Sequence, residues 1–301
     1  MWPKRYKLEI ASAWQRVNAV ASRTLETPWG RVEYAIVGSG QPGLMSHGVF
    51  GGHAEGLGMV RTYYGECAFA IAPSRFGYFA SELPPHATPA LQADVYATLL
   101  DALGIEKAVV IGFSAGGPSM IELALRHPHR VELLVLMASA LPCDPFPRLV
   151  TKMMPPLMRA AFSTDHMFWM FKTLMPRMFR HLIGVPKRYQ ASPAELATLR
   201  EVGESVFPIR PRRDGAVFDT FLGNPYVNSC PLEEITPPTL VIHAADDALA
   251  PYETAAKAAA RMPQARFVTI DRGGHELLGH EVAVRQAVAD SLLATRRLAA
   301  V

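Results

Sequence analysis

Short apolar runs alternate with segments of helical pattern along most of the chain. Four nearly continuous runs are Ala68 to Ala72, Ala108 to Phe113, Leu133 to Met137 and Leu240 to His243. Such runs are typical of strands buried on both faces of a parallel sheet. Arg31 to Val37 instead alternates polar and apolar residues, which predicts a half-exposed antiparallel strand. The pattern therefore predicts an α/β fold, with a mostly parallel central sheet and helices on both of its faces.

The alternation stops between Leu141 and Pro231, where the sequence becomes helical in pattern and rich in aromatic residues and methionine. Seven of the 13 methionines lie there. We interpret the stretch as an inserted helical cap over residues 141–231, with a core over 27–140 and 232–301 and a helical segment over 1–26. Because methionine fills irregular shapes, the cap either packs as a loose helical core or lines a pocket for an apolar substrate. The residues predicted to contact that substrate are Phe50, Met167, Trp169 and Met170.

Composition supports an ordered globular protein. Half of the 301 residues are hydrophobic and 19% are charged, a balance that predicts an ordered structure over nearly the whole chain. The net charge is +3, and the sequence has no run of like charges that would indicate a nucleic-acid partner. No stretch approaches the ~20 apolar residues of a membrane span. Three scattered cysteines and the absence of a secretory apolar core favour a reducing, cytoplasmic location. The sequence leaves open whether the protein forms a homodimer.

The N-terminal segment has two interpretations. Trp2, Tyr6 and Trp14 stand near Lys4 and Arg5, so the segment could lie on a membrane surface. We favour a helix packed on the body of the protein.

A candidate nucleophile lies in Gly112-Phe113-Ser114-Ala115-Gly116, which matches G-x-S-x-G. The pattern is weak alone, but it follows an apolar strand and precedes a helical segment, the context in which it has mechanical meaning. Such a turn holds the serine in a strained conformation that exposes its hydroxyl, and the glycines avoid collisions with the crossing strand and helix. We predict that Ser114 is the nucleophile; the alternative is a glycine-rich turn with an inert serine.

A serine hydroxyl needs a base, and imidazole is suited to that work near neutral pH. Of ten histidines, His275 is preferred because it follows the last predicted strand, Arg266 to Ile270, in a glycine-rich loop; His280 is its rival.

A carboxylate should orient the imidazole. Asp246 and Asp247 both follow the strand Leu240 to His243, and the one that does not reach the histidine is expected to serve in a turn or a helix cap. Asp144 is a third candidate acid.

Together these motifs resemble the α/β-hydrolase superfamily in its capped, esterase-like branch, from about Thr27 to the C-terminal helix. Asp247-Ala248-Leu249-Ala250-Pro251 is similar to the family's D-x-x-x-P after the strand that carries the acid, and this selects Asp247. Gly273-Gly274-His275 resembles the histidine loop, and the chain order Ser114, Asp247, His275 is that of the superfamily.

The resemblance also implies an oxyanion hole. His47-Gly48-Val49 matches the family's H-G-x, which implies that the backbone N–H groups of Val49 and Ala115 stabilise the developing negative charge. Phe50 would replace Val49 if the loop were shifted by one residue, and His47 is interpreted as structural. The preceding strand, Gly43 to Ser46, is short and its bounds are open.

The implied activity is hydrolysis of a small to medium apolar substrate through an acyl-enzyme, with a carboxylic ester the leading candidate over a lactone or an amide. A carbon–carbon bond hydrolase and a non-catalytic ligand sensor of the same fold are the alternatives. No cofactor or metal is expected, because the sequence holds no H-E-x-x-H motif, clustered Cys/His set or Walker-type loop. The expected partner is a small molecule.

Overall fold

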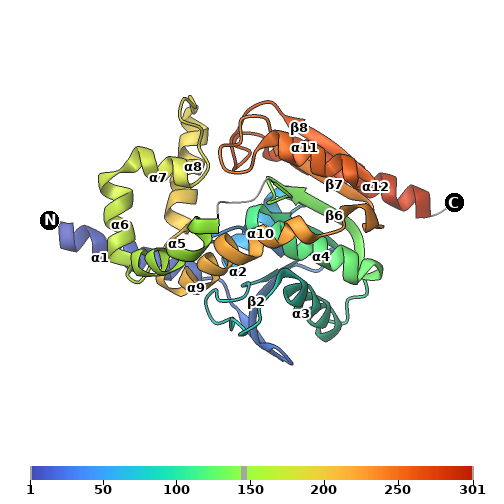
Figure 1. Ribbon diagram of the computed structural model, residues 1–301, viewed down its shortest axis with the longest axis horizontal. Helices are drawn as coiled ribbons and strands as arrows, with labels where there is room; N and C mark the ends of the chain where they lie inside the picture. Colours follow the sequence, from blue (N-terminus) through green and yellow to red (C-terminus); the bar gives the residue numbers. More distant parts are fainter. Residues whose placement is uncertain (1, 144–147, 300–301) are drawn as a thin grey trace.

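The computed structural model describes residues 2–143 and 148–299, which contain an eight-stranded sheet in the order β1-β2-β4-β3-β5-β6-β7-β8 (Figure 1). The pairs β1–β2 and β2–β4 are antiparallel and the other five are parallel, which confirms the predicted fold class. The strands are β1 (Arg23–Thr27), β2 (Gly30–Val37), β3 (Pro42–Ser46), β4 (Phe69–Pro73), β5 (Ala108–Phe113), β6 (Val131–Met137), β7 (Thr239–Ala244) and β8 (Ala265–Ile270).

Helices cover both faces of the sheet because successive strand side chains point to opposite sides. Val110 belongs to a hydrophobic cluster with α3, α4 and α11, whereas Val109 and Ile111 belong to a second cluster with α2 and α12. These helices are α2 (His53–Tyr63), α3 (Pro89–Ala102), α4 (Gly117–Arg126), α11 (Tyr252–Arg261) and α12 (Glu281–Ala299).

Between β6 and β7 the described residues form helices and turns and no strand, as the Met-rich pattern predicts. In Figure 1 the helices α5 to α8 of this insertion lie with α1 (Trp2–Asn18) at the end of the molecule away from the C-terminus, whereas α10 lies in the middle, towards α4. Its helices are α5 (Arg148–Ala161), α6 (Asp165–Leu174), α7 (Pro176–Leu182), α8 (Pro193–Ser205), α9 (Arg213–Phe218), the π-helical turn η4 (Asp219–Gly223) and α10 (Asn224–Tyr226). Short 3₁₀ turns are η1 (Ser114–Gly116), η2 (Pro128–Arg130), η3 (Arg210–Arg212), η5 (Val227–Ser229) and η6 (Leu232–Glu234).

Two N-terminal features differ from the expectation. The segment 1–26, predicted to be helical, contains the start of β1, an edge strand whose side chains are mostly exposed and so produce no apolar run. The weak strand before His47 is real and central, between β4 and β5. Its Gly43 is required because a Cβ there would lie 2.7 Å from Cδ1 of the Tyr64 ring.

Within residues 2–143 and 148–299, no helix combines the length and hydropathy needed to cross a bilayer.

Candidate active site

Ser114 stands at the sharp turn between β5 and α4, as the first residue of η1. Its φ of 52° is in the left-handed region, which a non-glycine residue adopts only when its surroundings enforce it. The turn is too tight for larger neighbours: a Cβ at Gly116 would lie 2.0 Å from the carbonyl oxygen of Ser46, and one at Gly112 would lie 2.8 Å from Cα of Gly117. The glycines of the motif are therefore a steric requirement of the crossing strand and helix.

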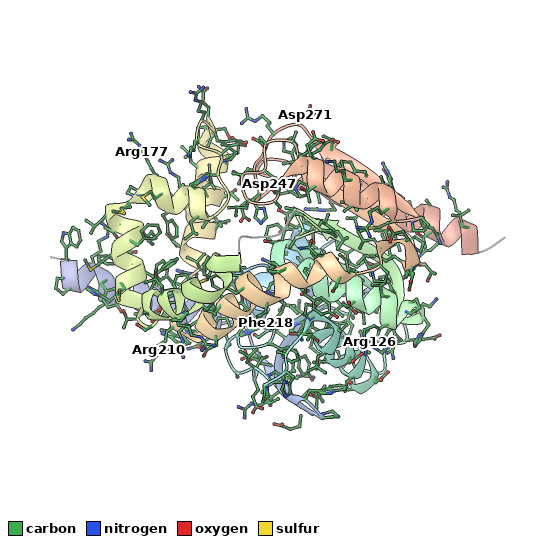
Figure 2. The ribbon with its side chains drawn as sticks, in the orientation of Figure 1. Arg126, Arg177, Arg210, Phe218, Asp247 and Asp271 are labelled. Carbon is green, nitrogen blue, oxygen red and sulfur yellow. The ribbon has the colours of Figure 1, made fainter. Side chains whose placement is uncertain are left out.

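The structure brings the three residues selected from the sequence together. His275, in the loop after β8, has Nε2 2.8 Å from Ser114 Oγ and Nδ1 2.8 Å from Asp247 Oδ2. The ring that reaches Ser114 is therefore that of His275 and not that of its rival His280. Figure 2 shows Asp247 at the end of the sheet that faces the helical insertion.

The side chain of Asp247 is fully buried and has four polar contacts. Its Oδ1 accepts from the N–H of Leu249 at 2.8 Å and of Ala250 at 3.0 Å, while Oδ2 also lies 3.3 Å from Nε2 of His243. Burial alone would raise the pKa of Asp247, but hydrogen bonds from His243 and His275 hold that pKa well below its ordinary value. Asp247 is therefore an anionic acceptor.

An anionic Asp247 determines the state of His275. Burial lowers the pKa of His275, but the hydrogen bond to Asp247 and its charge outweigh burial, so that the pKa rises above its ordinary value. With the Nδ1 proton donated to Asp247, Nε2 is free to accept the proton of Ser114.

The other candidate acids are placed differently. Asp246 lies in the turn after β7, as expected, and accepts from the N–H of Gly274 at 2.8 Å, so it also fastens the loop that carries His275. Asp144 lies outside the described residues.

The backbone groups expected to form the oxyanion hole adjoin Ser114. Ala115 is the second residue of η1, where N–H groups have no acceptor within the helix. Gly48 to Gly51 form a turn closed by the Gly51 N–H on the Gly48 carbonyl, with Phe50 at φ 68°. A Cβ at Gly48 would lie 3.0 Å from Cβ of Ser114, so the turn that carries Val49 rests against the serine. The oxyanion role itself stays a prediction.

A buried polar cluster fastens this turn to the insertion. It also fastens the sharp turn at Ser114 between β5 and α4, which we call the elbow. His47 Nε2 accepts from the Arg75 N–H at 3.1 Å, and the Arg75 guanidinium donates to the carbonyl of Ala115 and to Asp219 of η4. The Tyr78 hydroxyl donates to the same Asp219 oxygen at 2.5 Å. Burial raises the pKa of Asp219 to about 6, against the opposing effects of Arg75 and Tyr78. Both ring nitrogens of His47 thus contact backbone groups, which agrees with the structural role expected for it, and this cluster is a feature that the sequence patterns did not reveal.

A cavity of about 1050 Å³ lies over Ser114 and His275. Its walls come from the turn after β3, α2, α5, the end of α7, α8 and η4. Phe50 lines it as expected and packs edge-on against Phe162, with ring centroids 5.3 Å apart. Met158 also lines it. The volume suits a small-molecule site.

Three predicted contact residues are corrected by the structure. Met167, Trp169 and Met170 are not among the described residues that line the cavity. The physical reason is the orientation of α6, which turns Met167 and Met170 to the solvent and buries Trp169 against α1, where its Nε1 donates to Glu9 at 2.9 Å.

Across the described parts of the chain, no group of three or more His, Cys, Asp or Glu side chains is arranged to hold a metal ion.

Comparison with known proteins gives relatives among hydrolases. RutD of Caulobacter vibrioides, provisionally named a carbamate hydrolase, is 30% identical over 212 residues, which are 66% of this chain and 70% of that protein. The 2-hydroxymuconate semialdehyde hydrolase of Pseudomonas putida is 30% identical over 248 residues, covering 79% and 82% of the two chains. An α/β hydrolase fold protein from Nakamurella multipartita superposes with a TM-score of 0.70 at 28% identity, covering 91% of this chain and 99% of that one.

The sheet order, the strand-turn-helix around Ser114 and these relatives agree with a match to the family model described as the alpha/beta hydrolase family, which spans residues 44–290. The chain belongs to the α/β-hydrolase family.

Proposed function

We propose that this protein is a serine hydrolase of carboxylic esters, with Ser114 as nucleophile, His275 as general base and acid, and Asp247 as the residue that orients His275. The observation that carries the proposal is the position of His275, whose two ring nitrogens each lie 2.8 Å from an oxygen of the other two residues. This arrangement suits transfer of a proton from serine to imidazole next to a fixed anion.

The proposed reaction has two halves. Ser114 Oγ attacks the ester carbonyl carbon while His275 Nε2 takes its proton, and the N–H groups of Val49 and Ala115 bind the resulting oxyanion. The carbon–oxygen bond then breaks as His275 donates the proton to the leaving alcohol. A water molecule attacks the acyl-enzyme with His275 again as base, which releases the acid and restores Ser114.

The cavity lining favours a neutral, apolar substrate. Among its described residues there is no Lys or Arg, whereas Glu55, Glu201, Glu276 and Glu281 contribute to it. Burial raises the pKa of Glu276, beside His275, to about 7. Glu55 is paired with Arg212, but a carboxylate substrate would meet Glu201 and Glu281 with no Lys or Arg among the described lining residues to compensate them. A neutral ester of small to medium size fits this lining better.

Carbon–carbon bond hydrolysis is a second candidate, because the Pseudomonas putida relative named as 2-hydroxymuconate semialdehyde hydrolase matches most of this chain. A muconate semialdehyde carries a carboxylate, so the same lining disfavours that substrate. A substrate panel separates the two candidates: turnover of neutral esters with none of diketones supports the first, and the reverse supports the second.

We also propose that the segment 141–231 acts as the cap of the site. Leu141, Met158 and Phe162 of this segment line the cavity above Ser114. Substrate selection would then depend on the insertion, while the bond-breaking groups come from the sheet.

The proposal is tested by the variant Ser114→Ala. We expect labelling by a fluorophosphonate to disappear and turnover of p-nitrophenyl esters to fall by ~10⁶-fold in kcat, while the melting temperature changes little. The matched control Ser163→Ala, which removes a hydroxyl outside the cavity lining, should keep both signals.

Retention of more than about a tenth of kcat in Ser114→Ala would exclude Ser114 as the nucleophile. Labelling at Ser114 of the wild type without turnover of any ester, lactone or diketone would favour the ligand sensor instead.

A further inference from the structure

The outer side of α6 and α7 exposes an unusual apolar face. Met167, Met170 and Leu174 share one side of α6 at helical spacing, and Met175, Met178 and Leu182 repeat this spacing into α7. These six side chains are between 36% and 59% exposed. Adjoining apolar side chains of this size are seldom left in water on a soluble monomer without a binding role.

The N-terminal helix extends this face. Trp2 and Leu8 of α1 are 51% and 62% exposed. Trp2 meets Trp169 of α6 edge-on, with ring centroids 5.9 Å apart, and Lys172 of α6 donates to Glu9 of α1 at 3.1 Å. Figure 1 shows α1, α6 and α7 together at the end of the molecule that carries the N-terminus. We call this combined surface the outer face.

Positive charge is concentrated on the same segments. Residues 2–18 and 165–188 hold nine of the 30 Lys and Arg but only two of the 27 Asp and Glu, so the rest of the chain has 21 basic and 25 acidic residues. The two acids are both engaged, since Glu9 accepts from Lys172 and Asp165 accepts from the N–H of Ile209. Figure 2 shows Arg177 directed outward from this end. Arg5 and Lys172 pair with Glu9, and Arg16 pairs with Glu204. The other six basic residues leave the segments that form the outer face basic in an otherwise slightly acidic chain.

We propose that the outer face binds the surface of an anionic lipid bilayer. Exposed Trp, Met and Leu side chains can enter the boundary between headgroups and acyl chains, while Lys and Arg contact the lipid phosphates. A second copy of the chain is a poorer occupant, because two surfaces of the same strong positive charge would repel each other.

The outer face reaches the wall of the cavity. Leu182 belongs to the face and also lines the cavity, as does Ile183 next to it. One residue further on, the carbonyl of Gly184 accepts from the N–H of His275 at 3.2 Å. A bilayer on the outer face would therefore lie beside one wall of the cavity over Ser114.

The test measures co-sedimentation of the full chain with vesicles of phosphatidylcholine alone and of phosphatidylcholine mixed with phosphatidylglycerol. The protein carries Ser114→Ala throughout, so that binding is measured without hydrolysis and its failure is distinct from failure of the proposed ester hydrolysis. We expect binding to the anionic vesicles only, with an affinity that falls as salt is added.

Two double variants probe the two components of the outer face. Arg177→Glu with Arg180→Glu should weaken binding by at least about 25-fold, because each basic residue near an anionic surface strengthens binding about fivefold. Met175→Glu with Met178→Glu should weaken it by at least about tenfold, because charged residues replace the inserted apolar ones.

Matched controls lie elsewhere on the surface. Lys107→Glu with Lys257→Glu reverses two exposed charges, and Val282→Glu changes an apolar residue that is 78% exposed. Both should bind anionic vesicles within about twofold of the parent. The first control changes the net charge by the same amount as Arg177→Glu with Arg180→Glu, so that comparison cancels the general effect of charge.

The proposal fails if the parent protein does not sediment with anionic vesicles, if it binds neutral vesicles equally, or if control and outer-face variants lose binding alike. Sedimentation velocity supplies one more decisive result. A dimer that dissociates in Met175→Glu with Met178→Glu would assign the outer face to a second copy and overturn the lipid proposal.

Discussion

The adjacent carboxylates of Asp246 and Asp247 contact different parts of the loop that carries His275. Asp247 contacts the ring of His275, whereas Asp246 holds the backbone of the same loop through the N–H of Gly274. Local pattern alone could not separate them, because both follow β7 and neighbouring side chains point in different directions. The resemblance to D-x-x-x-P separated them, and the geometry agrees with that choice.

Asp247→Asn should lower kcat by ~10⁴-fold, because an amide at this position favours the wrong imidazole tautomer. The residual activity should also have a changed pH profile. Catalysis needs neutral His275, so kcat/KM falls as the pH drops through the imidazole pKa. Since Asp247 raises that pKa, its loss should move the acidic limb to lower pH. Steady-state kinetics over a pH series measures both effects.

Asp246→Asn is the matched control. Its amide oxygen can still accept from the Gly274 N–H, so a small loss with an unmoved acidic limb is expected. Equal, mild losses in both variants would remove Asp247 from the catalytic role and bring Asp144 forward.

Some residues of the site could not be found from the sequence because their partners are distant along the chain. His243 ends an apolar strand and lies against Asp247, and the only signal for it was a polar residue in a fully buried run. Arg75 pairs with Asp219 across 144 residues of sequence separation, with no local spacing that could indicate it.

At the scale of elements, the burial of a strand determines whether its position can be predicted from the sequence. Strands β5 and β7 are buried along their whole length and appear as continuous apolar runs, whereas the exposed edge strand β1 leaves no such run. The helices of the insertion were predicted by composition, but periodicity does not say which surface an apolar helix face meets. The apolar side chains of α6 meet α1, the aromatic core of the insertion around Phe168 and the solvent, and none of the described residues of α6 lines the cavity.

Arg75 contacts both Asp219 of η4 and the carbonyl of Ala115 in the elbow, so we expect this contact to contribute to the free energy of unfolding of the protein. Arg75→Met leaves Asp219 buried without its cation and the Ala115 carbonyl without its donor. The free energy of unfolding should fall by about 3–5 kcal/mol. Arg126→Met, which breaks a half-exposed pair with Asp94, should cost no more than about 1 kcal/mol. Urea unfolding of the two variants gives the comparison (Figure 2 marks Arg126).

Adding Asp219→Asn to Arg75→Met should recover part of the loss, since the buried negative charge is then removed. If Arg75→Met costs no more than Arg126→Met, or if the second change recovers nothing, the buried pair does not hold the insertion to the elbow.

At the scale of the whole molecule, the cavity exists because two separate parts meet over Ser114. The turns and loops that follow the strands supply the proposed reacting groups, and the insertion supplies much of the apolar lining, including Met158 and Phe162. Composition correctly indicated an insertion with more apolar surface than its own helices bury. It could not show that this surface divides between the cavity and the outer face.

That division makes the methionines of the insertion a direct test of where substrate binds. Met158 lines the cavity, whereas Met167 is 53% exposed on the outer face. Met158→Ala should shift kcat/KM towards longer acyl chains, because it opens room in the lining and removes contacts that a short chain uses. The ratio between medium and short p-nitrophenyl esters should change by an amount equivalent to ~1–3 kcal/mol. Met167→Ala, the same substitution outside the cavity, should leave that ratio unchanged, with folding of both variants confirmed by circular dichroism. A ratio that moves with Met167→Ala and not with Met158→Ala would place the acyl chain on the outer face and not beneath the insertion.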